Sequence, residues 1–317
     1  MSNSQSWATN MDKLKSLHSE IYDLIDNKSV AYIDIPIHYN VGDLLIYKGT
    51  ESFFSYYNVN VVYRADSCKV NFKELEKAEV ILFHGGGNFG DLYPLHQKLR
   101  EKIVIKYPNK RIICLPQTIL FTNKIAQEQS RTIFCQHNDF YFFVRDLNSK
   151  KIAFEFTKNV KLMPDMAHSL HPLVDSSEIA IKSSSNKILN LVRKDIESKD
   201  IEANRNINKN SFDWEDIITV TDNFLYKKYK RLSYLAPYSA NYSKKSITLW
   251  SKITHDIVFK SIEYFYIKDC VYTDRLHGLI LSSLLGKYVY LYDNTYGKNF
   301  SYFDLWLKDN PMINKIE

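Results

Sequence analysis

The stretch "AEVILFHGGGNFGDLYP", Ala78 to Pro94, joins an apolar run of strand type to a segment with four glycines in six positions. The whole chain of 317 residues has only nine glycines, so this concentration indicates a point where a Cβ atom would obstruct a close approach. We predict a buried strand that ends in a tight turn. The turn either only connects the strand to a helix capped by Asp91, or presents backbone N–H groups to a phosphate or sugar.

The sequence around this stretch alternates between strand-like and helix-like segments. An amphipathic helix over 11–26 comes first, because its apolar residues share one helical face. We then expect strands at 30–36, 59–65, 78–84, 111–116, 139–146 and 160–165, and helices at 43–57, 71–77, 94–106, 122–137 and 146–157. Strands that alternate with helices predict a parallel sheet covered by helices on both faces.

A second set of segments follows the polar stretch "KSSSNK" at 182–187, which has the composition of a linker. The strands expected here are 187–194, 270–274 and 288–293, and the helices are 245–266, 275–286 and 300–309. The region 195–243 fits no clear pattern. We therefore expect an α/β fold of two doubly wound, Rossmann-like domains, residues 1–181 and 182–317, that face each other across a cleft.

Charge and composition limit the classes of ligand and partner that this protein is expected to bind. The 42 basic and 36 acidic residues give a mild net charge of +6, which favours an anionic small substrate or a membrane-surface contact over nucleic-acid binding. The four cysteines contain no C-x-x-C pair, so a metal cluster is not expected. The N-terminal sequence lacks an apolar core of signal-peptide type, and no window of eighteen residues is apolar throughout, so we expect a cytoplasmic protein.

The nine glycines form three patches, each near the expected carboxyl end of a strand. Ligands of open parallel sheets bind at that edge, so the three patches predict a single site. Asp43 follows the first patch and serves either as a helix N-cap or as part of the site wall. The second patch contributes further wall residues: His84, Gly85, Gly86, Gly87, Asn88 and Asp91.

The third patch contains "TDRLHG", Thr273 to Gly278, between an expected strand and an expected helix. There the guanidinium of Arg275 and the imidazole of His277 would converge on one anion, since Arg clamps phosphate or carboxylate and His exchanges protons near neutrality. The alternative is an ion pair between Arg275 and Asp274 with His277 in the core. Arg193 ends the strand that opens the second domain, and is either a second anion clamp or a solvated charge.

Together, "VGD", "HGGGNFGD", the strand-end Arg193 and "TDRLHG" resemble the polysaccharide pyruvyltransferase family, in order across roughly residues 30–300. The resemblance implies a fold similar to the GT-B glycosyltransferases. It also implies transfer of a pyruvyl group from phosphoenolpyruvate (PEP) to two hydroxyls of a sugar in a surface polysaccharide, such as an exopolysaccharide or capsule, or in its precursor. His277 would then be catalytic, and Arg193 and Arg275 would bind PEP.

The chemistry implied by the resemblance needs no metal or other cofactor. A general acid such as His277 would protonate C3 of PEP, and Asp43, Asp91 or His84 would accept the hydroxyl proton, with the choice left open. Two alternatives remain. One is a GT-B-type glycosyltransferase that uses a sugar nucleotide, and the other is a non-catalytic sugar- or phosphate-binding protein.

Two features concern larger partners. The basic run "KKYKR", Lys227 to Arg231, is either a solvated helix face or a contact for anionic lipid headgroups or a lipid-linked acceptor at the inner face of the membrane. The helix at 11–26 is expected to pack against the body or to join a homo-oligomer, because its polar face carries both signs of charge. Whether the acceptor sugar is free, nucleotide-linked or lipid-linked stays open.

Overall fold

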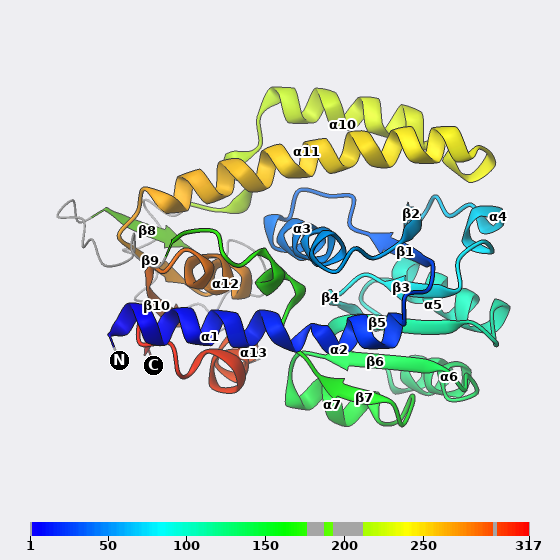
Figure 1. Cartoon of the computed structure of the whole chain (residues 1–317), viewed down its shortest axis with the longest axis horizontal. Helices are drawn as coiled ribbons and strands as arrows, with labels where there is room; N and C mark the ends of the chain where they lie inside the picture. Colours follow the sequence, from blue (N-terminus) through cyan, green and yellow to red (C-terminus); the bar gives the residue numbers. More distant parts are fainter. Residues whose placement is uncertain (1, 176–186, 193–211, 294–296, 317) are drawn as a thin grey trace.

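The computed structural model describes residues 2–175, 187–192, 212–293 and 297–316. Its strands form two parallel sheets, both flanked by helices (Figure 1). The first sheet contains β1 (Val30–Ile35), β2 (Val61–Asp66), β3 (Val80–Phe83), β4 (Gly86–Phe89), β5 (Arg111–Ile119), β6 (Phe140–Val144) and β7 (Val160–Leu162). The second contains β8 (Ile188–Leu191), β9 (Cys270–Thr273), β10 (Tyr288–Tyr292) and β11 (Ile313–Ile316). The two sheets lie on either side of the domain boundary expected near residue 181.

The helices of the first half are α1 (Asn3–Leu17), α2 (Ser19–Ile25), α3 (Val41–Tyr56), α4 (Phe72–Leu75), α5 (Pro94–Lys106), α6 (Lys124–Phe134), α7 (Leu147–Ala153) and the 3₁₀ turn η1 (Met166–Leu170). The second half contains η3 (Trp214–Ile217), α10 (Val220–Ser233), η4 (Ala236–Tyr238), α11 (Ala240–Tyr266), α12 (Leu276–Leu284), α13 (Lys298–Tyr302) and the π-helical turn η5 (Phe303–Leu307). No helix among the described residues has the length and apolarity needed to cross a bilayer.

Apolar side chains that point alternately to the two faces of each strand explain why both faces of the first sheet are covered. In β1, Tyr32 packs in one hydrophobic core with residues of α1 and α3, whereas Ala31 and Ile33 pack in another with residues of α5 and α6. Successive side chains of a strand point to opposite faces, so apolar residues at consecutive positions bury the sheet on both sides. The doubly wound first domain follows from this pattern.

The strand order places a ligand site at one edge. The first sheet runs β2-β1-β3-β5-β6-β7, with β4 paired to β5, so the chain reverses direction across the sheet between β1 and β3. The loops after β1 and β3 diverge at this point and leave a crevice beyond the carboxyl ends of the strands. The "HGGGNFG" stretch follows β3 directly and therefore lies at this crevice.

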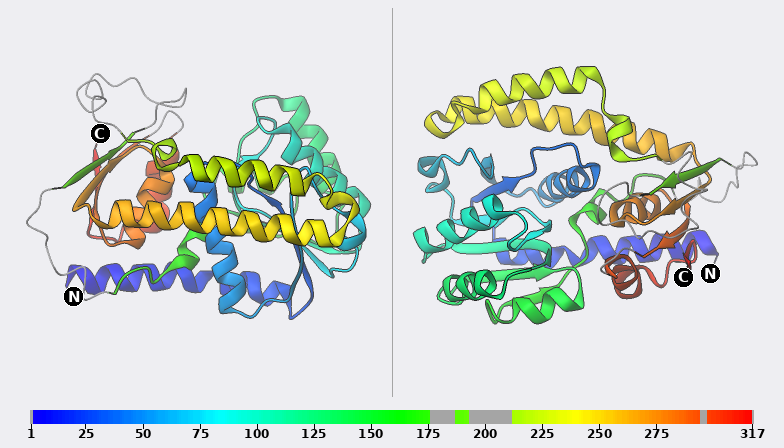
Figure 2. Two further views of the ribbon diagram at one scale, coloured as in Figure 1. Left: turned by 90° about the horizontal axis from the view of Figure 1, so that it is seen from above. Right: turned by 180° about the vertical axis from the view of Figure 1, so that it is seen from behind.

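Several segments hold the two sheets together. One hydrophobic core runs through both halves and includes Trp7, Leu44, Leu279 and Val289. Helices α1 and α2 together run beneath both halves, and the hairpin of α10 and α11 extends from the second half over the first (Figures 1 and 2). The indole N–H of Trp7 donates to the carbonyl of Ser283 at 2.5 Å. These contacts fix the distance between the two sheets, whose strands face each other with their carboxyl ends.

The structure corrects several expected elements. The glycine-rich stretch is not a simple turn, because Gly86–Phe89 forms β4 and pairs with β5. Its ends bend sharply at Gly86 and Gly90, whose φ angles of 122° and 134° suit glycine. The helix expected at 11–26 begins at Asn3 and is divided at His18, and α10 occupies part of the unassigned region. The tail forms α13, η5 and β11 rather than one helix.

Candidate active site between the two sheets

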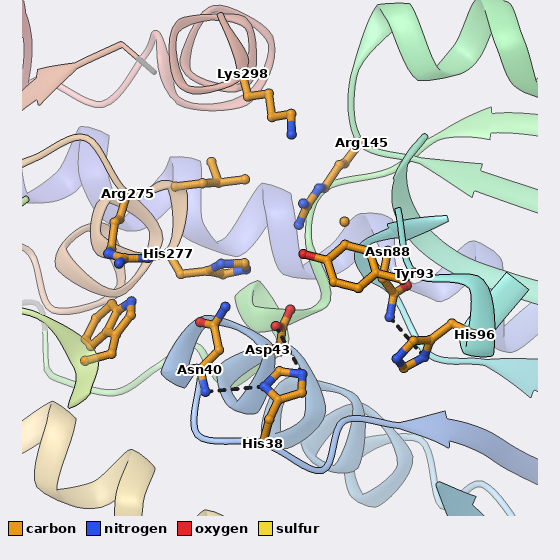
Figure 3. Close-up of a pocket in the computed structure, with 13 residues that line it drawn as sticks. His38, Asn40, Asp43, Asn88, Tyr93, His96, Arg145, Arg275, His277 and Lys298 are labelled. Carbon is orange, nitrogen blue, oxygen red and sulfur yellow. Dashed lines mark hydrogen bonds and ion pairs between the residues drawn. The ribbon is translucent and has the colours of Figure 1, made fainter. Parts of the chain in front are cut away.

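A cavity of about 350 Å³ lies where the carboxyl ends of the strands of both sheets face each other (Figure 3). Its walls come from the loop before α3, the start of α5, the end of β6 and the elbow between β9 and α12. The side chains are mostly polar or charged. The lining residues are His38, Asn40, Asp43, Gly87, Asn88, Tyr93, His96, Arg145, Trp214, Arg275, Leu276, His277 and Lys298.

The elbow after β9 positions the Arg and His of "TDRLHG". The hydroxyl of Thr273 accepts the backbone N–H of Arg275 at 3.0 Å, and Arg275 is the N-cap residue of α12. Its Nη2 atom donates to Oδ2 of Asp213 at 2.6 Å, with both side chains mostly buried. Asp213, on a distant segment, is thus one partner of Arg275. This ion pair orients the guanidinium at the cavity wall.

His277 meets a charged pair from the first domain. Its Nε2 atom lies 3.4 Å from Oδ2 of Asp165, and Nη1 of Arg145 lies 2.5 Å from the same oxygen. Asp165 is fully buried. Burial alone would raise the pKa of Asp165, but His277, Arg145 and the amide of Ala167 hold it below its ordinary value. The carboxylate of Asp165 therefore stays ionised beside the imidazole.

Arg145 is shared between Asp165 and the cavity. Its Nε atom donates to the hydroxyl of Thr118 at 2.8 Å, and Nη1 bonds Asp165. Nη2 lies close to Gly87, where a Cβ atom would come within 3.2 Å of it. Figure 3 shows Arg145 and Lys298 pointing into the same space from the two domains. Cationic groups from both sheets therefore border one cavity.

The first turn of α3 supports His277 from below. Asn40 caps this helix by accepting the N–H of Gly42 at 3.0 Å, so of the two roles considered for Asp43, cap or site wall, the cap belongs to Asn40. Asp43 instead lines the cavity, with Oδ2 at 3.6 Å from Nε2 of His38. A Cβ atom on Gly42 would overlap with Nδ1 of His277. Glycine is needed here because the imidazole packs directly on the helix backbone.

The glycine-rich stretch contributes less to the wall than expected. Gly87 and Asn88 line the cavity, whereas Gly85 and Gly86 are buried behind it. The backbone here is largely used in pairing β4 with β5, since Gly86 pairs with Gln117 and Phe89 with Ile119. The part of this backbone left to form the predicted floor of N–H donors is therefore Gly87 and Asn88, which lie between the two paired residues.

Two other predicted wall residues lie elsewhere. His84 is buried, and its Nδ1 atom is 2.5 Å from the hydroxyl of Tyr32. Burial lowers the pKa of His84 to about 4, so the ring is neutral. Asp91 does not line the cavity, because its carboxylate accepts the amides of Thr122 and Asn123 at 2.8 and 2.7 Å. Asp91 is also not the N-cap residue of α5. Neither residue lines the cavity.

A buried ionic network stands behind the other end of the cavity. Oδ2 of Asp34 forms an ion pair with Nη2 of Arg100 at 2.5 Å, and both side chains are completely buried. The other carboxylate oxygen of Asp34 lies 2.6 Å from Nδ1 of His96, on the first turns of α5. Burial would raise the pKa of Asp34, but Arg100 and His96 hold it below its ordinary value. The ionised carboxylate fixes His96, which lines the cavity beside Asn88.

The structure thus unites five of the predicted residues: Asp43, Gly87, Asn88, Arg275 and His277. Arg193 lies outside the described residues. Sequence reasoning missed Arg145, although it follows the strand-like run "FYFFV" in the strand-end position. It also missed His96, Asp165 and Lys298, whose local sequence carries no motif. Only the pairing of distant strand ends brings these residues together.

The fold and the cavity define an α/β protein with a cation-rich ligand site between two parallel sheets. A profile of the polysaccharide pyruvyl transferase family matches residues 40–296. The chain is 36% identical over 97% of its length to a putative pyruvyl transferase, EpsO, of Bacillus subtilis, covering 94% of that protein. It is 29% identical over 88% of its length to pyruvyl transferase 1 of Schizosaccharomyces pombe, covering 70% of that protein. The chain therefore belongs to the polysaccharide pyruvyl transferase family.

A solved structure is similar in fold. The crystal structure of a functionally uncharacterised protein from Klebsiella pneumoniae superposes with a TM-score of 0.59 at 21% identity. The match covers 95% of this chain and 97% of that one. The similarity in fold thus extends over both sheets, and supports the two-domain α/β architecture expected from the sequence.

Proposed function

We propose that this transferase moves a pyruvyl group from PEP to two hydroxyls of a sugar in a surface polysaccharide or its precursor, forming a ketal. The observation that carries the proposal is the meeting of Arg145, Arg275 and Lys298 with the His277–Asp165 pair around one cavity. PEP is small and carries a phosphate and a carboxylate. Guanidinium and ammonium groups on opposite walls suit a ligand with two anionic ends.

The donor side would act through His277. In this step the imidazolium of His277 gives a proton to C3 of PEP, and C2 becomes electrophilic. The oxygen of a sugar hydroxyl forms a bond to C2 and loses its proton. The bond between C2 and the phosphate oxygen then breaks, and inorganic phosphate leaves with the bonding pair. The second hydroxyl adds to C2 and loses its proton, which completes the ketal.

The acceptor side needs a base, and His96 is the residue we assign to it. Asp34 lies beside Nδ1 of His96 and holds that nitrogen as the N–H donor, so the other ring nitrogen keeps its lone pair. His38 and Asp43 line the same cavity and are the competing candidates. Of these, only His96 has a fully buried carboxylate partner.

Calorimetric titration of the purified protein with PEP, UDP-sugars and CMP-sugars tests the donor. We expect PEP to bind, and Arg275→Met to raise its dissociation constant at least about tenfold, because one charged contact to an anion is lost. Lys151→Met removes an exposed charge on α7 and is the matched control, with unchanged affinity expected. Binding of a sugar nucleotide but not PEP would overturn the proposal in favour of a glycosyltransferase.

Mass spectrometry of the surface glycan tests the reaction itself. Deletion of the gene should remove the pyruvyl ketal mass, and the wild-type gene should restore it. The His277→Ala gene should not restore it, although the purified variant keeps its fold by circular dichroism. Restoration by His277→Ala would point instead to a non-catalytic binding protein.

A further inference from the structure

Helix α10 presents an outer face with an unusual charge. From Asn223 to His255 the sequence contains seven lysines and arginines and no aspartate or glutamate. The charge of this segment exceeds the net +6 of the whole chain, so the remainder of the protein is close to neutral. The cations are exposed: Lys227, Lys228, Lys230, Arg231, Lys244, Lys245 and Lys252. The positive charge of this protein is therefore concentrated on the α10–α11 hairpin.

The two faces of α10 differ in a way that fixes its orientation. Asp222 and Tyr229 lie on the inner face and are buried, with the hydroxyl of Tyr229 donating to Asp66 at 2.5 Å. Lys260 of α11 bonds Asp222 at 2.8 Å. The first pair joins α10 to the first sheet, and the second joins α10 to α11. The outer face is consequently held away from the body in a single orientation.

Large apolar side chains share this outer face with the cations. Phe224, Tyr234 and Tyr238 are 68%, 70% and 83% exposed, and Val220 and Leu235 are also exposed. Along α10, Val220, Phe224, Lys227, Arg231 and Tyr234 follow helical spacing and form one stripe. The hairpin is the outermost layer of the molecule in both side views, with α10 on its outside (Figures 1 and 2). As the outermost layer, this stripe is accessible to a large, flat partner.

We propose that this stripe docks the protein on the surface of an anionic phospholipid bilayer. Lysine and arginine attract anionic headgroups, while aromatic rings enter the interface between headgroups and acyl chains. Val220 and Leu235 suit that interface and have no role in stacking on nucleic-acid bases. Self-association through the same face would place like charges against each other across a two-fold axis. The proposal does not depend on the identity of the donor or acceptor.

Sedimentation with vesicles tests this docking in the full-length protein. We expect binding to phosphatidylcholine vesicles that contain phosphatidylglycerol, and little binding to phosphatidylcholine alone. Raising the salt from about 0.1 M to about 1 M should release the protein, because the screening length falls from about 10 Å to about 3 Å. Lys227→Glu/Lys228→Glu should lower the partition coefficient at least about tenfold. Phe224→Ser/Tyr234→Ser should weaken binding while leaving its salt dependence in place.

The matched control is Lys151→Glu/Lys158→Glu, an equal charge reversal at exposed residues near α7, on the opposite side of the molecule in Figure 1. It should bind vesicles like the wild type. PEP binding and circular dichroism of every variant verify that the fold and the cavity are intact. Equal binding to neutral vesicles, no binding at all, or an equal loss in the control would overturn the proposal. So would a hairpin variant that changes only the oligomeric state in analytical ultracentrifugation.

Discussion

Nε2 of His277, from the second domain, lies 3.4 Å from Oδ2 of Asp165, which follows the last strand of the first sheet. The same carboxylate is bonded to Arg145. Through this contact, the proposed general acid depends on the relative position of the two sheets. The core that runs through both halves, together with α1, keeps that position fixed.

Asp165→Asn should destabilise the fold strongly. The substitution leaves Arg145 buried without its counter-ion, and breaking a buried pair of this kind costs about 3–5 kcal/mol. Since the pKa of Asp165 is lowered in the folded protein, its contribution is complete above the ordinary carboxyl pKa and is lost as the pH falls below it. Urea unfolding of wild type and variant at neutral and acidic pH should therefore show a difference that narrows towards low pH.

Asp139→Asn is the control for that measurement, because Asp139 pairs with Arg111 at the surface. Its effect should stay within about 1 kcal/mol. If Asp165→Asn were as stable as Asp139→Asn at neutral pH, the pair with Arg145 would not support the site as described.

Two alanine substitutions in helix α3 should separate catalysis from stability. A Cβ atom on Gly42 overlaps with the imidazole of His277, whereas one on Gly49 overlaps with the backbone carbonyl of Met166. Gly42→Ala should lower turnover at least about tenfold by moving the ring, with stability maintained because Ala favours a helix by up to about 1 kcal/mol. Gly49→Ala should instead lose about 1–3 kcal/mol, since a backbone cannot move aside easily.

Thermal unfolding and turnover measured on both variants are sufficient to check this. The same substitution, made seven positions apart on one helix, should lower turnover at Gly42 and stability at Gly49. A Gly42→Ala enzyme with normal turnover would show that His277 does not need its present position.

His96→Gln should abolish proton acceptance at the acceptor hydroxyl while leaving the donor side intact. We expect kcat to fall by about 10²–10⁴-fold and the dissociation constant for PEP to stay within about threefold. Steady-state kinetics and calorimetry give the two values separately. His38→Gln changes another histidine of the same cavity, with a more exposed side chain. A larger loss of kcat in His38→Gln would transfer the role of base to His38.

Stability should fall as the solution becomes mildly acidic. Burial lowers the pKa of His18 and His84 to about 4 and that of His168 to about 3. The unfolded chain takes up these protons near the ordinary histidine pKa of about 6.5, so the stability is complete above that pH and is lost as the pH falls toward 4. Each histidine contributes up to about 1.4 kcal/mol per pH unit in this window. Urea unfolding midpoints that stay constant between pH 7 and pH 5 would contradict the neutral, buried state of these rings.

Much of the architecture could be predicted from local sequence. Each strand of the first sheet except β4 lies within or next to an expected segment, because apolar runs between helical patterns have a short-range signature. The elbow with Arg275 and His277 was equally readable, since strand, glycine and helix follow one another along the chain. Strand β4 was missed because glycines normally weaken strands. Strand β11 was missed because its four residues are too few to show a clear strand pattern.

The sequence by itself determined the α/β alternation and five residues of the site, because the propensities and spacings that specify them act over a few neighbouring positions. The tertiary structure alone decided that Asp165 and Arg145 meet His277, that Asn40 rather than Asp43 caps α3, and that His96 is held by Asp34. Apart from the local cap, these relationships join residues that are distant along the chain. They follow from the order of strands in the sheet and from burial, which makes an ionised group stable only beside its partner.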